Sequence, residues 1–297
     1  MIMNNDYKGK VALLLNIAPA ISQESSFAMH GGTAINLFVQ DLPRYSVDID
    51  LTYIQINISR EESLLGINDK LKQIREKLLK RIPGIIVRTV ANKLLCSLRG
   101  VDVKIEVNPI KRGLIEPAEE RPLCERAQND FGIFCKVKTV SISQLYGGKI
   151  GAALDRQHPR DMFDVKCMFD KGISIDSVKR GFIYDLLSGK RPFSEMLSPN
   201  HIDRREAMDN QFEGMSNIPF TYSDYEETRE RLTYSIQSVL TDNDKIFLLD
   251  FSVGDPQWDN SEYAYFKDFP SVKWKQQNIQ MLNGKSTKTY AGIRQIK

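Results

Sequence analysis

The sequence feature that most constrains the fold is the strict alternation of residues 45–53, YSVDIDLTY. Apolar and polar side chains exchange at every position, which is the period of two expected for a β-strand with one buried face. Asp48 and Asp50 then project from the same face, ~6.6 Å apart along the strand. Carboxylates this close repel each other unless a cation lies between them, so the pattern fits a divalent-metal site. A plain solvated strand face fits it equally well.

A glycine pair precedes this strand. Residues 27–30 form a short apolar run typical of a strand, Gly31 and Gly32 interrupt it, and residues 33–39 have apolar positions at helical spacing. Glycine lets a backbone approach a phosphate closely, and the N-terminus of a helix offers free N–H groups. Thr33 adds a hydroxyl. The pair is thus either a phosphate-binding turn or an ordinary turn.

A second alternating segment, residues 101–107, carries Glu106 on its polar face. If this strand lies beside residues 45–53, Glu106 can join Asp48 and Asp50. Three acids around two metal ions form the arrangement that clamps the attacking and leaving oxygens in phosphoryl transfer. The alternative is a surface glutamate on a half-exposed strand.

The remaining periodicities divide the chain of 297 residues into two parts. A mixed part contains predicted helices over 8–24, 61–81 and 142–156, another starting near Asp161, and strands over 84–90 and 93–99. Helices dominate the second part, over 177–190, 224–240, 242–250 and 271–283. We therefore predict an α+β fold: a small mixed β-sheet core flanked by helices (residues 1–170) and a mainly helical C-terminal domain (residues 171–297).

Composition excludes several protein classes. The 41% hydrophobic and 27% charged residues exclude a collagen-like or disulfide-scaffold chain. No window approaches the ~18 uninterrupted apolar residues of a membrane helix, so we expect no membrane partner. The run KVALLLNIAPA, residues 10–20, is interpreted as a helix of the mature protein rather than a secretion signal. Four cysteines without a C-x-x-C pair indicate free thiols and a cytoplasmic location.

Several segments together resemble a known family. The segment HGGTAINLFVQDLPRYSVDID, residues 30–50, resembles motif I of the DNA polymerase β-like nucleotidyltransferases. More narrowly, it is similar to the AbiEii-type toxins of bacterial toxin–antitoxin and phage-defence systems. The segment KIEV at 104–107 matches the second block of that family, and residues 145–164 match its third and fourth blocks. Gly147 and Gly148 depart from the pattern, since relatives carry Glu or Ala there, and they indicate close packing or a kink.

The resemblance implies Mg²⁺-dependent transfer of a nucleoside monophosphate from a nucleoside triphosphate to an acceptor hydroxyl. In that comparison the metal positions, for two Mg²⁺ ions, are Asp48, Asp50 and Glu106, and Glu106 also helps to deprotonate the acceptor. The triphosphate positions are Gly31, Gly32, Thr33, Arg44, Ser46, Lys149 and Arg160. Asp161 falls on a further catalytic position.

Structural alternatives remain for several of these residues. Lys149 could be an exposed helix lysine, and Asp161 could cap the helix that it opens. Arg44 could reach a phosphate or pair with a strand carboxylate. Ser46 could stabilise the turn into the strand instead of touching substrate.

The acceptor and the partners follow from the resemblance as expectations. Relatives that transfer nucleotides modify tRNA ends, and toxins of this kind have a cognate antitoxin. The net charge of +3 is only weakly basic, so RNA binding depends on local charge. Residues 70–81 and the tail from Lys267, with Trp274 and Tyr290 interleaved, are basic enough for RNA, and they fit ordinary solvated faces as well. Two other functions stay open: a nucleotide-binding regulatory protein without turnover, and nucleotidylation of a protein or a small molecule.

Overall fold

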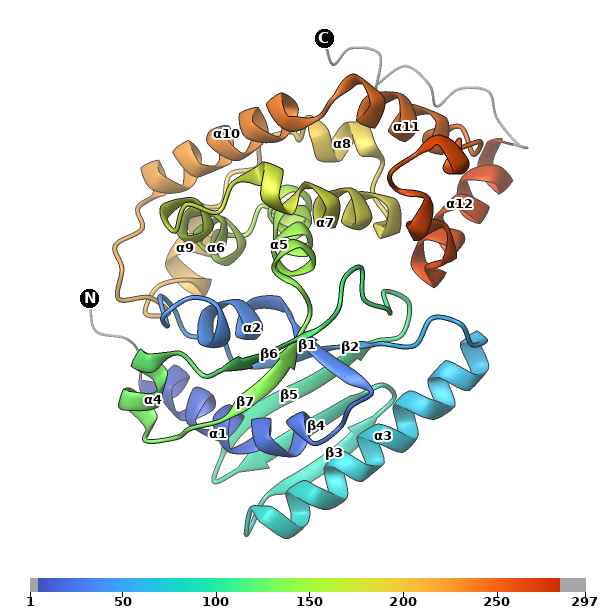
Figure 1. Ribbon diagram of the computed structural model, residues 1–297. Coiled ribbons are helices and arrows are strands. Elements are labelled where there is room, and N and C mark those ends of the chain that lie inside the picture. Colours follow the sequence, from blue (N-terminus) through green and yellow to red (C-terminus); the bar gives the residue numbers. More distant parts are fainter. Residues whose placement is uncertain (1–4, 284–297) are drawn as a thin grey trace. The chain divides into compact units, whose positions relative to one another are not determined.

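The structure, a computed structural model, describes residues 5–283 (Figure 1). The chain forms two compact units. The sheet unit comprises the residues up to Leu145 together with Met208–Phe220, and the helical unit comprises Tyr146–Ala207 and the residues from Thr221 on. The predicted boundary near residue 170 differs from this division because α6 (Pro159–Asp170) packs against α10 (Tyr222–Val239) inside the helical unit.

The sheet unit is built on one seven-stranded mixed sheet with the order β3-β4-β5-β2-β1-β7-β6. The pairs β2–β5 and β1–β7 are parallel, and the other pairs are antiparallel. The strands are β1 (Phe27–His30), β2 (Asp48–Tyr53), β3 (Ile86–Val90), β4 (Lys93–Leu98), β5 (Val101–Asn108), β6 (Glu119–Pro122) and β7 (Lys136–Thr139). This mixed sheet with flanking helices confirms the predicted α+β fold class.

Alternation along the central strands separates a buried face from a half-exposed one. Ile49 and Leu51 on β2 are fully buried, as are Ile105 and Val107 on β5. In the same unit, α1 (Asn5–Ser22) packs against β5 and β7, and α3 (Arg60–Arg81) packs against β3 and β4 (Figure 1). The intervening polar residues of β2 and β5 are therefore left on the half-exposed face.

One helix and one hairpin of this unit follow simple sequence rules. A capping box at Ser59 and Glu62 starts α3, because each side chain accepts a hydrogen bond from the backbone N–H of the other. Gly100, with φ +80°, makes the tight reversal from β4 to β5. The unit also holds α2 (Gly31–Phe38) and α4 (Glu125–Phe131).

Two predicted element starts were wrong. Helix α2 begins at Gly31, so the glycine pair forms its first turn and does not precede it. Strand β2 begins at Asp48 and not at Tyr45. The reason is a distant segment of the sheet unit: the Tyr45 N–H donates to the Met215 carbonyl at 2.8 Å, and Arg44 forms an isolated β-bridge with Ser216.

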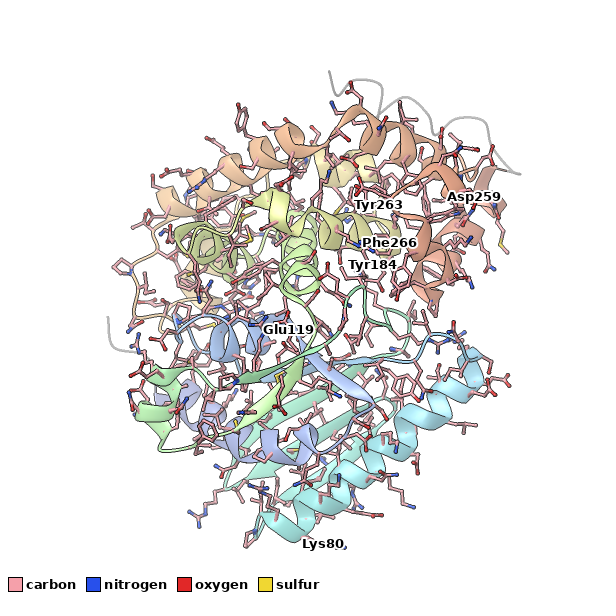
Figure 2. All side chains as sticks on the ribbon, in the orientation of Figure 1. Lys80, Glu119, Tyr184, Asp259, Tyr263 and Phe266 are labelled. Carbon is pink, nitrogen blue, oxygen red and sulfur yellow. The ribbon has the colours of Figure 1, made fainter. Side chains whose placement is uncertain are left out.

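The helical unit surrounds an aromatic core. Its elements are α5 (Ile142–Arg156) and α9 (Arg205–Gln211), which both cross the unit boundary, α6, α7 (Ile175–Ser188), α8 (Phe193–Leu197), α10, α11 (Asp242–Ser252), two 3₁₀ turns (Trp258–Asn260 and Ala264–Asp268) and α12 (Pro270–Asn283). Figure 2 shows Tyr184, Tyr263 and Phe266 close together. The ring centroid of Phe266 lies 5.4 Å from that of Tyr184 and 6.0 Å from that of Tyr263. Such contacts bury large apolar areas and explain how this unit holds together.

The structure also bears on composition-based expectations. No helix among residues 5–283 is long and apolar enough to cross a membrane. All four cysteines are free thiols, as predicted.

Candidate functional site

The polar faces of β2 and β5 meet in register. In this parallel pair, Asp50 is the Cα partner of Glu106, and Asp48 is the partner of Lys104. In-register neighbours project from the same face of a sheet, so three carboxylates and one ammonium group share the half-exposed face. The predicted adjacency of the two strands is confirmed.

Two lysines hold the Glu106 carboxylate. Its two oxygens lie 2.9 Å from Lys93 Nζ and 3.0 Å from Lys104 Nζ. Burial alone would raise the pKa of Glu106, but hydrogen bonds and charge from these lysines outweigh it and lower that pKa. Burial likewise opposes the charge of Lys104, yet Glu106 and the strand aspartates together raise the pKa of the lysine. Glu106 and Lys104 are therefore charged near neutral pH.

The side chains of Asp48, Asp50 and Glu106 do not form the predicted metal-binding cluster in this structure. Between residues 5 and 283, no group of three or more His, Cys, Asp or Glu side chains is placed to hold a metal ion. The physical reason is that Glu106 is engaged by Lys93 and Lys104. The donor chemistry still suits a hard cation, because Asp48 and Asp50 are half-buried oxygen donors two positions apart on one strand face. Their metal role stays a prediction.

The first turn of α2 closely approaches this carboxylate face. Gly31 has φ +75°, and a Cβ atom there would lie 2.5 Å from Asp50 Oδ2. His30, the residue before it, is the Cα partner of Asp50 on β1. Glycine is therefore required at position 31 both for its backbone conformation and for the space that Asp50 occupies.

Buried polar groups line the inner side of the same turn. A Cβ atom at Gly32 would lie 2.9 Å from Arg44 Nη2 and 3.0 Å from Ser46 Oγ. The Thr33 hydroxyl hydrogen-bonds to the Asp48 carbonyl and is 3.0 Å from Ser46 Oγ. Arg44 Nη1 donates to its neighbour's backbone carbonyl at 2.9 Å. The Thr33 hydroxyl thus ties the turn to β2 and to Ser46, which agrees with the structural alternative for Ser46.

A second ionic cluster lies inside the helical unit. Lys149 Nζ on α5 is 2.8 Å from Asp161 Oδ1 and 2.9 Å from Asp164 Oδ2, both on α6. All three residues are buried. Burial alone would raise the pKa of Asp161, but the charges of Lys149 and Arg156 outweigh it and lower that pKa. The alternative that Lys149 is an exposed helix lysine is wrong.

The structure also decides how α6 begins. His158 is the N-cap residue, and its Nδ1 accepts a hydrogen bond from the Arg160 N–H at 3.1 Å. Asp161 therefore pairs with cations rather than capping the helix. Arg160 is half-buried at the second helical position.

Sequence reasoning missed one residue of these clusters, Lys93. Lys93 was not selected, and its only signal is that β4 and β5 form a hairpin in which Lys93 faces Glu106. Asp164 carries a weak signal, because it lies three residues after Asp161 and so shares its helix face.

Close helix packing explains Gly147, the first of the two glycines before Lys149. A Cβ atom at Gly147 would lie 2.1 Å from the backbone carbonyl carbon of Gly181 on α7. A Cβ atom at Gly148 would meet nothing nearer than 3.9 Å. The backbones of α5 and α7 therefore touch at Gly147, as the close-packing interpretation predicts.

We expect Gly147→Ala to destabilise the protein by about 3 kcal/mol, because backbone must move to admit the methyl group. Gly148→Ala is the matched control, and it should be neutral or stabilising by up to about 1 kcal/mol through helix propensity. Urea unfolding followed by circular dichroism measures both. Equal midpoints for the two variants would contradict the packing argument.

The basic stretches are placed differently from each other. The basic residues between 70 and 81 lie on the exposed and half-buried face of α3, where Lys72, Lys80 and Arg81 are exposed. In the second stretch Trp274 is exposed, but Lys275 is buried. The predicted basic positions Lys285, Lys288, Arg294 and Lys297, and the aromatic Tyr290, lie outside the described residues.

The chain is similar to known proteins in sequence and in fold. The sequence model of the family described as "Nucleotidyl transferase AbiEii toxin, Type IV TA system" matches residues 12–278. Among solved structures, the chain is similar to the MenT4 nucleotidyltransferase toxin of Mycobacterium tuberculosis, with 12% identity, a TM-score of 0.61, and 94% of this chain and 93% of that chain covered. The CdnC:HORMA-deltaN complex of E. coli also matches at 12% identity over 89% and 88% of the chains, with a TM-score of only 0.22. No curated protein matches the sequence.

Proposed function

Because this chain belongs to the AbiEii family of nucleotidyl transferase toxins of type IV toxin–antitoxin systems, we propose that it transfers a nucleoside monophosphate from a nucleoside triphosphate to the 3′ end of tRNA. The single observation that carries the chemistry is the in-register pair of Asp50 and Glu106 on parallel strands, with Gly31 against Asp50. Membership of a type IV system implies a cognate antitoxin as well as the triphosphate substrate.

The carboxylate face is proposed as the reaction centre. Two Mg²⁺ ions, held by Asp48 and Asp50 with Glu106 at the second ion, would supply the positive charge that stabilises the transition state of phosphoryl transfer. Glu106 would accept the proton of the acceptor hydroxyl. Lys93 and Lys104 orient its two oxygens.

The first turn of α2 is proposed as the triphosphate cradle. Gly31 and Gly32 present backbone N–H groups without side chains in the way, and the helix N-terminus favours an anion. The buried hydroxyl of Thr33 ties this turn to the Asp48 carbonyl, so Thr33 and Ser46 would hold the cradle in shape. Arg44 adds positive charge beside Gly32.

Lys149, Arg160 and Asp161 are proposed to act on the triphosphate through charge, because the family resemblance assigns that role to these three positions. Asp161 and Asp164 share the ammonium group of Lys149, so these carboxylates would set its position and limit its movement. Lys149 would then contribute as a fixed point charge, and Asp161 as a positioning residue.

The acceptor decides between this proposal and its rivals. The protein is incubated with each α-³²P-labelled nucleoside triphosphate, Mg²⁺ and total bacterial RNA, beside the Asp48→Ala variant. Label in tRNA that is absent with Asp48→Ala supports the proposal. Label in protein would instead favour protein nucleotidylation, and nucleotide binding without any label would favour a regulatory protein.

Growth provides the test of the toxin role. Expression of the protein in a bacterial host should arrest growth, and Asp50→Asn should relieve the arrest because transfer is lost. Arrest that persists with Asp50→Asn at equal protein level would contradict nucleotidyl transfer as the toxic activity.

A further inference from the structure

The helical unit contains a cavity of about 320 Å³ that the proposed chemistry does not use. It lies where the end of α7, the start of α8, α11 and α12 meet. Its principal lining residues are Lys190, Arg191, Phe193, Trp274, Lys275 and Asn278. Three of the residues that line it are cationic, and none is Asp or Glu. This charge complements an anion, and the volume is at the lower end of that of small-molecule sites.

An exposed indole forms one wall of the cavity. Trp274 on α12 is 39% exposed, so part of the indole is accessible to a ligand in the cavity. By contrast, Trp258 packs edge-on against Phe247 and Phe251, with ring centroids 5.3 and 6.0 Å away. Asn278 follows Trp274 by one helical turn, so its amide lies on the same face of α12. An aromatic plane beside an amide suits a nucleobase.

A buried lysine fixes the segment that bears the cations. The Lys275 ammonium group donates to the carbonyls of Leu186 at 2.8 Å and of Arg191 at 2.9 Å. It also lies 4.3 Å from the centroid of the Phe193 ring. These contacts tie α12 to the segment between α7 and α8, so the backbone that carries Lys190 and Arg191 is held at the cavity.

The two outer cations differ in how they are engaged. Arg191 pairs with Asp155 at 2.5 Å and with Glu195 at 2.9 Å, and all three side chains are about half exposed. Lys190 is exposed on the cavity wall. Exposed pairs of this kind are weak and exchange readily for a phosphate. Lys190 is thus the cation to change in a test.

We propose that this cavity binds one nucleotide of a single-stranded RNA, with the base stacked on Trp274 and held by Asn278, and the phosphate beside Lys190 and Arg191. The inference rests on the proposed function only in identifying that RNA as the acceptor. The binding itself depends on the helical unit alone, so it can be measured without transfer.

The two tryptophans of the chain make the test direct. In a full-length Trp258→Phe variant, Trp274 is the only tryptophan, and red-edge excitation selects its emission over that of the 11 tyrosines. A short single-stranded oligoribonucleotide should quench this emission saturably. Adding Lys190→Glu should weaken the affinity about tenfold and flatten its salt dependence. Lys273→Glu is the matched control, because Lys273 is an exposed lysine on α12 outside the cavity lining, and it should change affinity less than about twofold.

Four results would overturn the assignment. These are no quenching by the oligoribonucleotide, equal weakening by Lys190→Glu and Lys273→Glu, tighter binding of free AMP than of the oligoribonucleotide, or Trp274 emission that changes with protein concentration alone. The third result would indicate a free-nucleotide site, and the fourth a second copy of the chain. Adding Asp48→Ala should leave quenching intact, so loss of transfer and loss of this binding site are distinguishable.

Discussion

Replacing Asp50 by asparagine is expected to lower the rate of nucleotidyl transfer by about a thousandfold. The substitution keeps the shape of the side chain beside Gly31 but removes the negative charge that we propose holds the metal ions. The rate is measured as pyrophosphate released per folded protein with saturating nucleoside triphosphate, Mg²⁺ and the acceptor.

Asp102→Asn is the matched control for this experiment. Asp102 is an exposed carboxylate on β5, and it projects from the same face as Glu106. Its loss should leave the rate within about twofold of the natural protein, because it lies at the far end of the strand from the Asp50–Glu106 pair. A rate for Asp50→Asn above about a tenth of the natural one, with an unchanged unfolding midpoint, would refute the assignment of the reaction centre.

Local periodicity was enough to predict much of the sheet. Strands β3, β4 and β5 lie within two residues of their predicted ends, because alternation and the Gly100 reversal are local signals. The start of β2 could not be predicted in this way, since residues 215–216 pair with Arg44 and Tyr45 from far along the chain. Strands β6 and β7 were missed because four residues with several charges carry no clear period.

The candidate site shows the same limit in chemical form. The spacing of Asp48 and Asp50 predicts that they share one face of a strand. The parallel register with β5 places Glu106 on that same face of the sheet. The ion pair between Glu106 and Lys93 depends on the register of a third strand, β4, and the sequence alone does not specify that register. The helical pattern of residues 142–156 could not predict that Lys149 is buried between two aspartates, because this burial depends on how α5 packs against α6.

Lys149→Met should destabilise the protein by about 3–5 kcal/mol at neutral pH. The substitution keeps the length of the chain but leaves Asp161 and Asp164 buried without the ammonium group that lies between them. Lys166→Met is the control. Lys166 lies on α6, the helix that carries Asp161 and Asp164, and pairs with Asp170 at 2.6 Å; this partly exposed pair should contribute less than about 1 kcal/mol. Urea unfolding at pH 7 compares the two variants, and equal losses would contradict the importance of the buried cluster.

The pH dependence of the same variant separates charge from packing. In the natural protein the pKa of Asp161 is lowered on folding, so this group stabilises the fold above its unfolded pKa, and that stability is lost as the pH falls through the folded pKa. Without Lys149 the lowering is reduced, and protonation of the buried carboxylates relieves their repulsion. The stability difference between the natural protein and Lys149→Met should therefore shrink as the pH falls from 7 toward about 4. A difference that stays constant over this range would mean that the lysine acts through packing of its aliphatic chain and not through its charge.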